Sequence, residues 1–227
     1  MMKLLLILLL TVSPLRQVND FIIKVDLNNN GIFKSYSNMN FKQNVIKNKK
    51  DYIIKIENTN FYSLNLNYKI KLNESWLKSA APLLKELALK IYNKSMYLKD
   101  YFDYLSVYLK DIKYSEQDFP QDSKSVIINK KAHCIGFSNL ASEMLNAISI
   151  KNKFIKGFYL KKAENNSFQP VPHRWLEVIF DDNGKFFYDP QYQGFSYNYI
   201  VINNKIDFKH IRIFKVFAIK IKKRMIF

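Results

Sequence analysis

Residues 129–160 read NKKAHCIGFSNLASEMLNAISIKNKFIKGFYL and include Cys134, the only cysteine of the chain. After Cys134 the apolar residues recur at intervals of three and four, which is the pattern of a helix with one face on a core. The residues on this stripe are Phe137, Leu140, Ala141, Met144, Leu145 and Ile148. Cys134 precedes Phe137 by three residues, so the spacing predicts a cysteine in the first turn of a buried helix.

This position favours a reactive thiolate at Cys134. The first N–H groups of a helix have no acceptor within the helix, and they carry partial positive charge that stabilises an anion. Cysteines with this environment and an imidazole nearby become nucleophiles near neutral pH. A lone cysteine on a helix stripe is also a common small core residue, so a catalytic role requires a base and a group that orients the base.

The base must come from three histidines, His133, His173 and His210. His133 is adjacent to Cys134 and points about 100° away from it on a helix, so it is poorly placed to take the thiol proton. His173 opens the strand-like run HRWLEVIF, and the chain returns through KFFYDP after the turn residues DDNG. The start of the first strand then lies near the end of the second, which makes His173 and Asp189 cross-strand neighbours whose register the sequence leaves open.

The wider pattern predicts an α+β fold with a β-rich N-terminal region. The runs FIIKVDL, DYIIKIE and FYSLNLNYKIKL favour antiparallel strands within residues 20–75. Residues 76–93 and 98–112 have helical periodicity, and further strands follow at 153–160, 173–180 and 185–190 and in the alternating tail. We therefore expect a signal segment at 1–19, a β-rich region at 20–75 and a second domain at 76–227.

Four motifs in this order resemble the transglutaminase-like superfamily, whose members have a papain-type fold. They are CIGFSNLASEML, KFIKG, HRWLEVIF and YDP, and the resemblance extends over roughly residues 76–200. It implies a catalytic helix packed on an antiparallel sheet, with Cys134 as the nucleophile, His173 as the base and Asp189 as the residue that orients His173. Ala132 departs from the family pattern, which usually has glycine two residues before the cysteine. No cofactor or metal is implied.

The chain is strongly basic, with 36 Lys and Arg residues against 19 Asp and Glu residues and a formal charge of +17. Lysine is spread over nearly every segment, which is typical of a compositional bias, although a surface selected for anion binding remains the alternative. No nucleic-acid-binding motif is present, so we expect no nucleic-acid partner. Lys3 and the apolar residues 4–12 resemble a signal peptide and are too few to span a bilayer, which predicts a secreted or periplasmic protein; an anchor or a buried strand is the alternative.

The sequence therefore predicts a thiol-dependent hydrolase or acyltransferase that acts on amide bonds of peptides, proteins or cell-wall peptides. The positive charge should repel protonated amines, which favours water as the acceptor of the acyl group. The alternatives are a catalytically inactive module that keeps the fold and a basic protein that binds an anionic cell-wall polymer or a membrane surface.

Overall fold

The computed structural model describes residues 16–25, 33–48, 51–59, 64–162, 167–180, 184–194, 198–203 and 213–223. The helices in these ranges are α1 (Glu74–Ser79), α2 (Pro82–Tyr92), α3 (Leu98–Lys110), α4 (Ser123–Asn129) and α5 (Cys134–Ala147). The strands are β1 (Arg16–Val25), β2 (Tyr36–Ser37), β3 (Phe41–Asn48), β4 (Asp51–Thr59), β5 (Lys113–Tyr114), β6 (Lys131–Ala132), β7 (Lys151–Lys162), β8 (Ser167–Ile179), β9 (Lys185–Tyr188), β10 (Tyr199–Val201) and β11 (Ile213–Lys223). This mixture of helices and antiparallel strands confirms the predicted α+β class.

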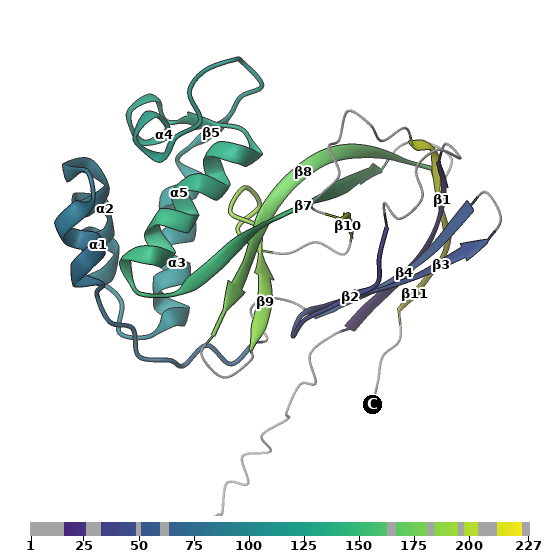
Figure 1. The fold of residues 1–227 in the computed structure, drawn as a ribbon, viewed down its shortest axis with the longest axis horizontal. Helices are drawn as coiled ribbons and strands as arrows, with labels where there is room; N and C mark the ends of the chain where they lie inside the picture. Colours follow the sequence, from purple (N-terminus) through teal and green to yellow (C-terminus); the bar gives the residue numbers. More distant parts are fainter. Residues whose placement is uncertain are drawn as a thin grey trace, which may run out of the picture.

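One antiparallel sheet of nine strands organises the fold. Its order is β10-β7-β8-β11-β1-β4-β3-β2, and β9 pairs with the last residues of β8. The helices lie together at one end of the molecule and β1 to β4 at the other, while the long curved strands β7 and β8 connect the two ends (Figure 1). β8 therefore contacts both parts of the protein, and the site residue His173 lies on this strand.

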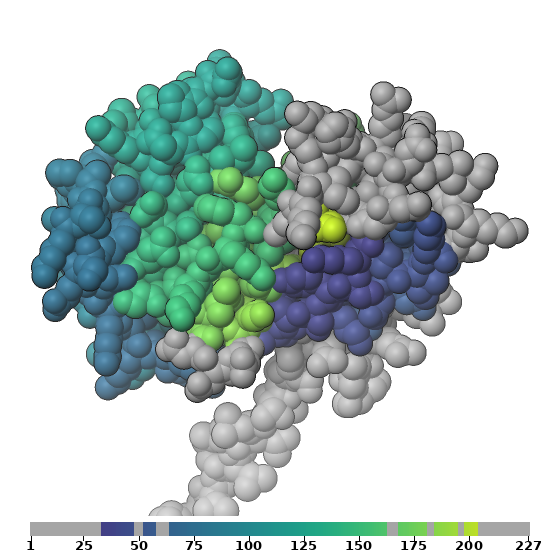
Figure 2. All heavy atoms as spheres, in the orientation of Figure 1, coloured from purple at the N-terminus to yellow at the C-terminus, as the bar shows by residue number. Residues whose placement is uncertain are grey.

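Strands from both ends of the chain share this sheet. β1 pairs with β4 on one side and with the C-terminal strand β11 on the other, and β11 also pairs with β8. In the space-filling view the atoms of residues 33–48 lie directly against those of β8 and β9 (Figure 2). The division between residues 20–75 and 76–227 stays a prediction. Residues 1–15 of the expected signal segment lie outside the described residues.

Helix α5 begins at Cys134, as the apolar stripe predicted. All six stripe residues are buried in a cluster that also contains side chains of α2, α3, β8 and β9. Because the stripe packs against both helices and sheet, α5 is fixed along its length, and so is the cysteine at its first position.

Two predicted elements differ from the structure. Residues 76–93 form two helices because Pro82 cannot continue a helix from the preceding turn, and it instead takes the first position of α2. Residues 64–73 are extended but belong to no strand. Their carbonyl groups accept hydrogen bonds from the first N–H groups of α3, with Tyr68 O bound to Leu98 N at 2.8 Å. The alternating pattern thus reflects an extended segment that caps a helix and buries Leu66 and Ile70.

Two buried amides of the N-terminal part close the free edges of the sheet. Asn40 bonds both backbone groups of Phe187 on β9, with Phe187 N–H donating to Asn40 Oδ1 at 2.8 Å. Gln43 does the same for Val201 on β10, with both distances 2.9 Å. Each side chain therefore substitutes for a neighbouring strand, because a buried backbone group without a partner is costly.

The glycines of two motifs are required by close packing. A Cβ on Gly136 would lie 2.4 Å from Gln121 Oε1 and 3.0 Å from the Cβ of Ala132. The missing side chain of Gly136 thus leaves room for Ala132 and for the Gln121 amide. A Cβ on Gly157 would lie 2.0 Å from the carbonyl oxygen of Ile200 and 2.5 Å from the Trp175 ring.

Gly157→Ala should destabilise the protein by about 1–3 kcal/mol or more, because the new methyl group meets backbone atoms of β10 that cannot rotate away. Gly194→Ala is the matched control, since its Cβ would have no neighbour closer than 3.9 Å. We expect this control to change stability by less than about 0.5 kcal/mol. Urea unfolding of both variants measures the difference, and equal stabilities would contradict the close packing.

Candidate active site

Cys134 lies at the first position of α5, and the start of this helix is held by side chains on both sides. His133 is the N-cap, and its Nδ1 accepts the N–H of Ile135 at 3.2 Å. Gln121 Oε1 in turn accepts the N–H of His133 at 3.0 Å. Burial and the nearby Arg174 charge lower the pKa of His133, which keeps its ring neutral and able to accept. The imidazole next to Cys134 therefore caps the helix, in agreement with its poor placement as a base.

His173 and Asp189 are neighbours across the hairpin of β8 and β9. The pairing of Leu176 with Tyr188 sets the register and leaves Asp189 two residues from the position opposite His173. The two side chains share one face of the sheet, because residues two positions apart along a strand point to the same side. His173 Nε2 contacts Asp189 Oδ2 at 2.7 Å, and both side chains are buried. The expected cross-strand contact is thus present, in a diagonal register.

The thiol of Cys134 lies within hydrogen-bonding reach of the His173 ring. Because Nε2 is occupied by Asp189, Nδ1 is the ring nitrogen that can face the sulfur. Burial alone lowers the pKa of His173, but the charge and hydrogen bond of Asp189, together with Cys134, raise it to about 10. The His173 ring therefore carries its proton near neutral pH.

The carboxylate of Asp189 is fully buried and accepts hydrogen bonds on both oxygens. Oδ1 accepts the backbone N–H of Gln191 at 2.9 Å and that of Tyr192 at 3.4 Å. Oδ2 accepts from His173 and from the hydroxyl of Tyr199 on β10. Burial, followed by the Asp189 charge, raises the pKa of Tyr199, so this hydroxyl keeps its proton and acts as a donor.

Arg174 joins β8 to the first turns of α5 on the opposite face of the strand from His173. Its Nη2 donates to the carbonyl oxygen of Ile135 at 2.7 Å and to Asn139 Oδ1 at 2.6 Å. Its carbonyl oxygen accepts from the hydroxyl of Ser138 at 3.0 Å. These contacts fix the helix start relative to the strand, and they place a positive charge near the thiol of Cys134.

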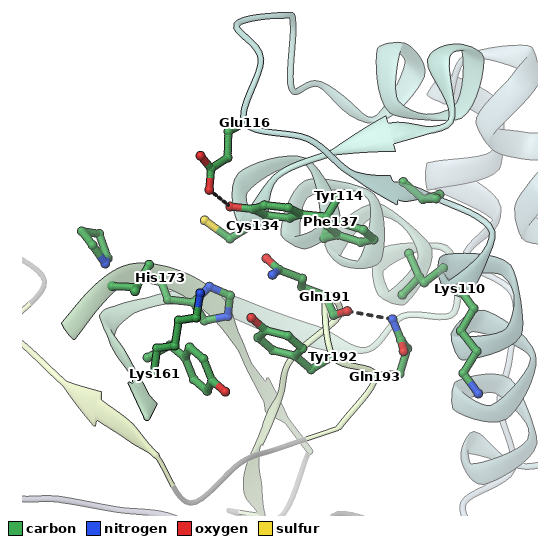
Figure 3. Close-up of a pocket in the computed structure, with 15 residues that line it drawn as sticks. Lys110, Tyr114, Glu116, Cys134, Phe137, Lys161, His173, Gln191, Tyr192 and Gln193 are labelled. Atoms are coloured by element: carbon green, nitrogen blue, oxygen red, sulfur yellow. Dashed lines mark hydrogen bonds between the residues drawn. The ribbon is translucent and has the colours of Figure 1, made fainter. Parts of the chain in front are cut away.

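A cleft of about 630 Å³ opens in front of Cys134 and His173. Its walls include the aromatic rings of Tyr114, Phe137, Tyr159 and Tyr192, and Figure 3 shows Lys110, Lys161 and Glu116 at its margins. The Tyr114 hydroxyl lies on the same side of the cleft as the thiol and donates to Glu116 at 3.1 Å (Figure 3). A cleft of this volume, with apolar rings and a few polar groups in its walls, is typical of a ligand-binding site.

Gln191 directs its side-chain amide into this cleft toward Cys134 and His173 (Figure 3). The amide contacts the hydroxyl of Tyr192. Its Oε1 is buried and has no hydrogen-bond partner within the described part of the chain. A buried acceptor without a donor is unfavourable, so this oxygen is suited to an incoming N–H group.

Sequence reasoning identified Cys134, His173 and Asp189, and the structure brings these three side chains together. It missed Gln191 and Tyr199, which follow the D-P motif in a segment without a recognisable pattern. The only available signal was the closeness of Gln191 to Asp189 in the sequence. In the described ranges, no three His, Cys, Asp or Glu side chains lie close enough to share a metal ion.

Comparison with known proteins finds a matching superfamily and similar folds. Residues 83–190 match the transglutaminase-like superfamily, which confirms the resemblance of the four motifs. No curated protein has a significant sequence match to the chain. A candidate cysteine protease from Cytophaga hutchinsonii has a similar structure with a TM-score of 0.50 and 11% identity, over 92% of this chain and 89% of that one. The periplasmic domain of TgpA from Pseudomonas aeruginosa gives a TM-score of 0.44 and 8% identity, over 81% and 89% of the two chains.

Proposed function

Because residues 83–190 match the transglutaminase-like superfamily, we propose that this protein cleaves amide bonds of peptides or proteins through a thioester on Cys134. The observation that carries the proposal is that Cys134 and His173 meet at one open cleft, while the buried Asp189 bonds the other nitrogen of His173. A nucleophile, a base and a group that orients the base are the components that thiol acyl transfer requires.

In the proposed reaction the sulfur of Cys134 attacks the amide carbon, and the carbonyl electrons move onto oxygen. The first-turn N–H of Cys134 has no acceptor within α5, and it is available to bind this oxygen. When the tetrahedral intermediate collapses, the C–N bond breaks and His173 gives its Nδ1 proton to the departing amine. Water or an amine then attacks the thioester, with His173 as the base, and the free thiol returns.

The unpaired oxygen of Gln191 supports an amide rather than an ester as the substrate. A secondary amide carries an N–H that can donate to Gln191 Oε1, whereas an ester has no donor at that position. A buried polar atom of the site that stays unpaired when the wrong substrate binds makes the enzyme select against that substrate. Tyr192 bonds the Gln191 amide beside the cleft and so helps to fix its orientation.

Iodoacetamide should alkylate Cys134 at nearly its maximal rate at about pH 6, because the His173 imidazolium stabilises the thiolate there. An ordinary thiol has a pKa of about 8.5 and reacts through its thiolate, so it would be slower at this pH by about two orders of magnitude. The chain has one cysteine, so total labelling measured by mass spectrometry reports on this thiol alone.

The control for this measurement is His173→Gln, which removes the imidazolium and should restore ordinary thiol titration. A wild-type rate that rises only above about pH 8 would exclude the activated thiol and favour the inactive binding module.

Gln191→Met should lower kcat/KM for a peptide amide by about 10–100-fold, while cleavage of the matching ester should stay nearly unchanged. This range corresponds to about 1–3 kcal/mol for one hydrogen bond to a buried acceptor. Gln117→Met, an exposed glutamine outside the cleft, is the control and should affect neither substrate. Equal losses on the amide and the ester would show that Gln191 does not bind the amide N–H.

We also propose export from the cytoplasm, on the basis of Lys3 and the apolar residues 4–12. Within the described part of the chain, no helix has the length and apolar character to cross a bilayer. Since β1 begins at Arg16, cleavage at or before residue 15 would leave this strand intact. Mass spectrometry of protein from the native host should therefore find an N-terminus close to Arg16. Detection of intact Met1 in a purely cytosolic pool would refute export.

A further inference from the structure

Two donors meet at one oxygen of Asp189. Oδ2 accepts from His173 Nε2 at 2.7 Å, and it also accepts from the hydroxyl of Tyr199. Tyr199 is fully buried, and its ring stacks on that of His173, with centroids 5.5 Å apart and an interplanar angle of 22°. It lies on β10, nine residues beyond the end of the segment that matches the superfamily at residue 190.

We propose that Tyr199 is a fourth, positioning member of the site, which fixes the carboxylate of Asp189 and limits how strongly this carboxylate holds the His173 imidazolium. The inference rests on the proposed roles of Cys134 and His173. It adds a residue whose hydroxyl reaches His173 through Asp189, while its ring stacks on the imidazole.

The electrostatic reason is the placement of the phenolic hydrogen. The positive end of the Tyr199 O–H bond lies at the same oxygen that attracts the imidazolium, so it offsets part of the carboxylate charge. His173 must release its proton to the leaving amine, and an imidazolium bound too strongly by Asp189 would be a poor acid. The hydroxyl therefore favours proton release while it keeps Asp189 in place.

Tyr199 is itself held in position by its strand. β10 pairs with β7 on one edge, and Gln43 bonds both backbone groups of Val201 on the other. The Tyr199 ring also contacts Trp175, with ring centroids 5.1 Å apart. With the ring and the backbone both fixed, the hydroxyl is held at Asp189 Oδ2.

The groups around His173 come from each element packed against it. The titratable and charged ones are Cys134 of α5, Arg174 of β8, Asp189 after β9, Tyr159 of β7, Tyr192 of the following loop and Tyr199 of β10. Of these, Asp189 and Cys134 bond to the ring, and Tyr199 is the tyrosine whose hydroxyl bonds to Asp189. A change at the Tyr199 hydroxyl should thus reach His173 through the carboxylate.

The test is the imidazole titration of His173, followed by NMR in the full-length protein between about pH 6 and 11. The chain has three histidines, so the ring signals can be assigned by substituting the other two. Tyr199→Phe keeps the ring and removes the hydroxyl, and we expect the pKa of His173 to rise by about one unit. Activity should fall about tenfold in kcat with KM nearly unchanged, since the substrate does not touch Tyr199.

Tyr101→Phe is the matched control. Tyr101 is a fully buried tyrosine whose hydroxyl bonds the carbonyl oxygen of Met144 at 2.8 Å, far from the site along α3 and α5. It should lose stability as Tyr199→Phe does, but the titration of His173 should not move. A His173 titration that is the same in Tyr199→Phe and wild type would overturn the inference and leave Tyr199 as a packing residue.

A second variant keeps the test decisive if Tyr199→Phe folds poorly. Site-specific 3-fluorotyrosine at position 199 has a more acidic hydroxyl, which donates more strongly, so the pKa of His173 should fall rather than rise. No shift, or a shift upward, would refute the inference. The alkylation of Cys134 distinguishes a failure of the proposed function from a failure of the role of Tyr199. An ordinary wild-type thiol refutes the proposed function. An activated thiol together with an unchanged His173 titration refutes only the role of Tyr199.

Discussion

The buried carboxylate of Asp189 is the constraint on which the site depends. An ionised carboxylate removed from water costs several kcal/mol unless hydrogen bonds replace its hydration. Its donors come from β8, from the loop after β9 and from β10, so the carboxylate is stable only when all three segments are in place. The bond that orients the imidazole of His173 is therefore formed together with the local fold.

The N-terminal strands support the strands that carry these donors. Asn40 closes the edge of β9 two residues before Asp189, and Gln43 closes the edge of β10 two residues after Tyr199. A third link joins Tyr36 to the buried Glu177 of β8, which also pairs with Lys153 at 2.6 Å. The β-rich N-terminal region thus contacts the sheet at the points where the geometry of the site is set.

The periodicity of apolar residues predicted an element correctly where one face of that element is buried. It predicted an element wrongly where the backbone groups bond to a helix end instead of to a neighbouring strand. The stripe of α5 predicted both the helix and its first residue, because a single apolar face packs on the core. Residues 64–73 alternate like a strand, but their carbonyl groups cap α3 instead of forming a ladder. The split at Pro82 follows from proline chemistry, which outweighs a continuous apolar pattern.

The sequence by itself determined the α+β class and the helix that carries Cys134 in its first turn, because these depend on local spacing, and the family resemblance predicted that Cys134, His173 and Asp189 act together. Only the tertiary structure decided the diagonal register of His173 and Asp189, the unpaired oxygen of Gln191 and the hydroxyl of Tyr199 on Asp189. A register depends on the turn and on every neighbouring strand. The bond between Tyr199 on β10 and Asp189 after β9 depends on how Asn40 and Gln43 hold these two strands. No local sequence pattern predicts such long-range contacts.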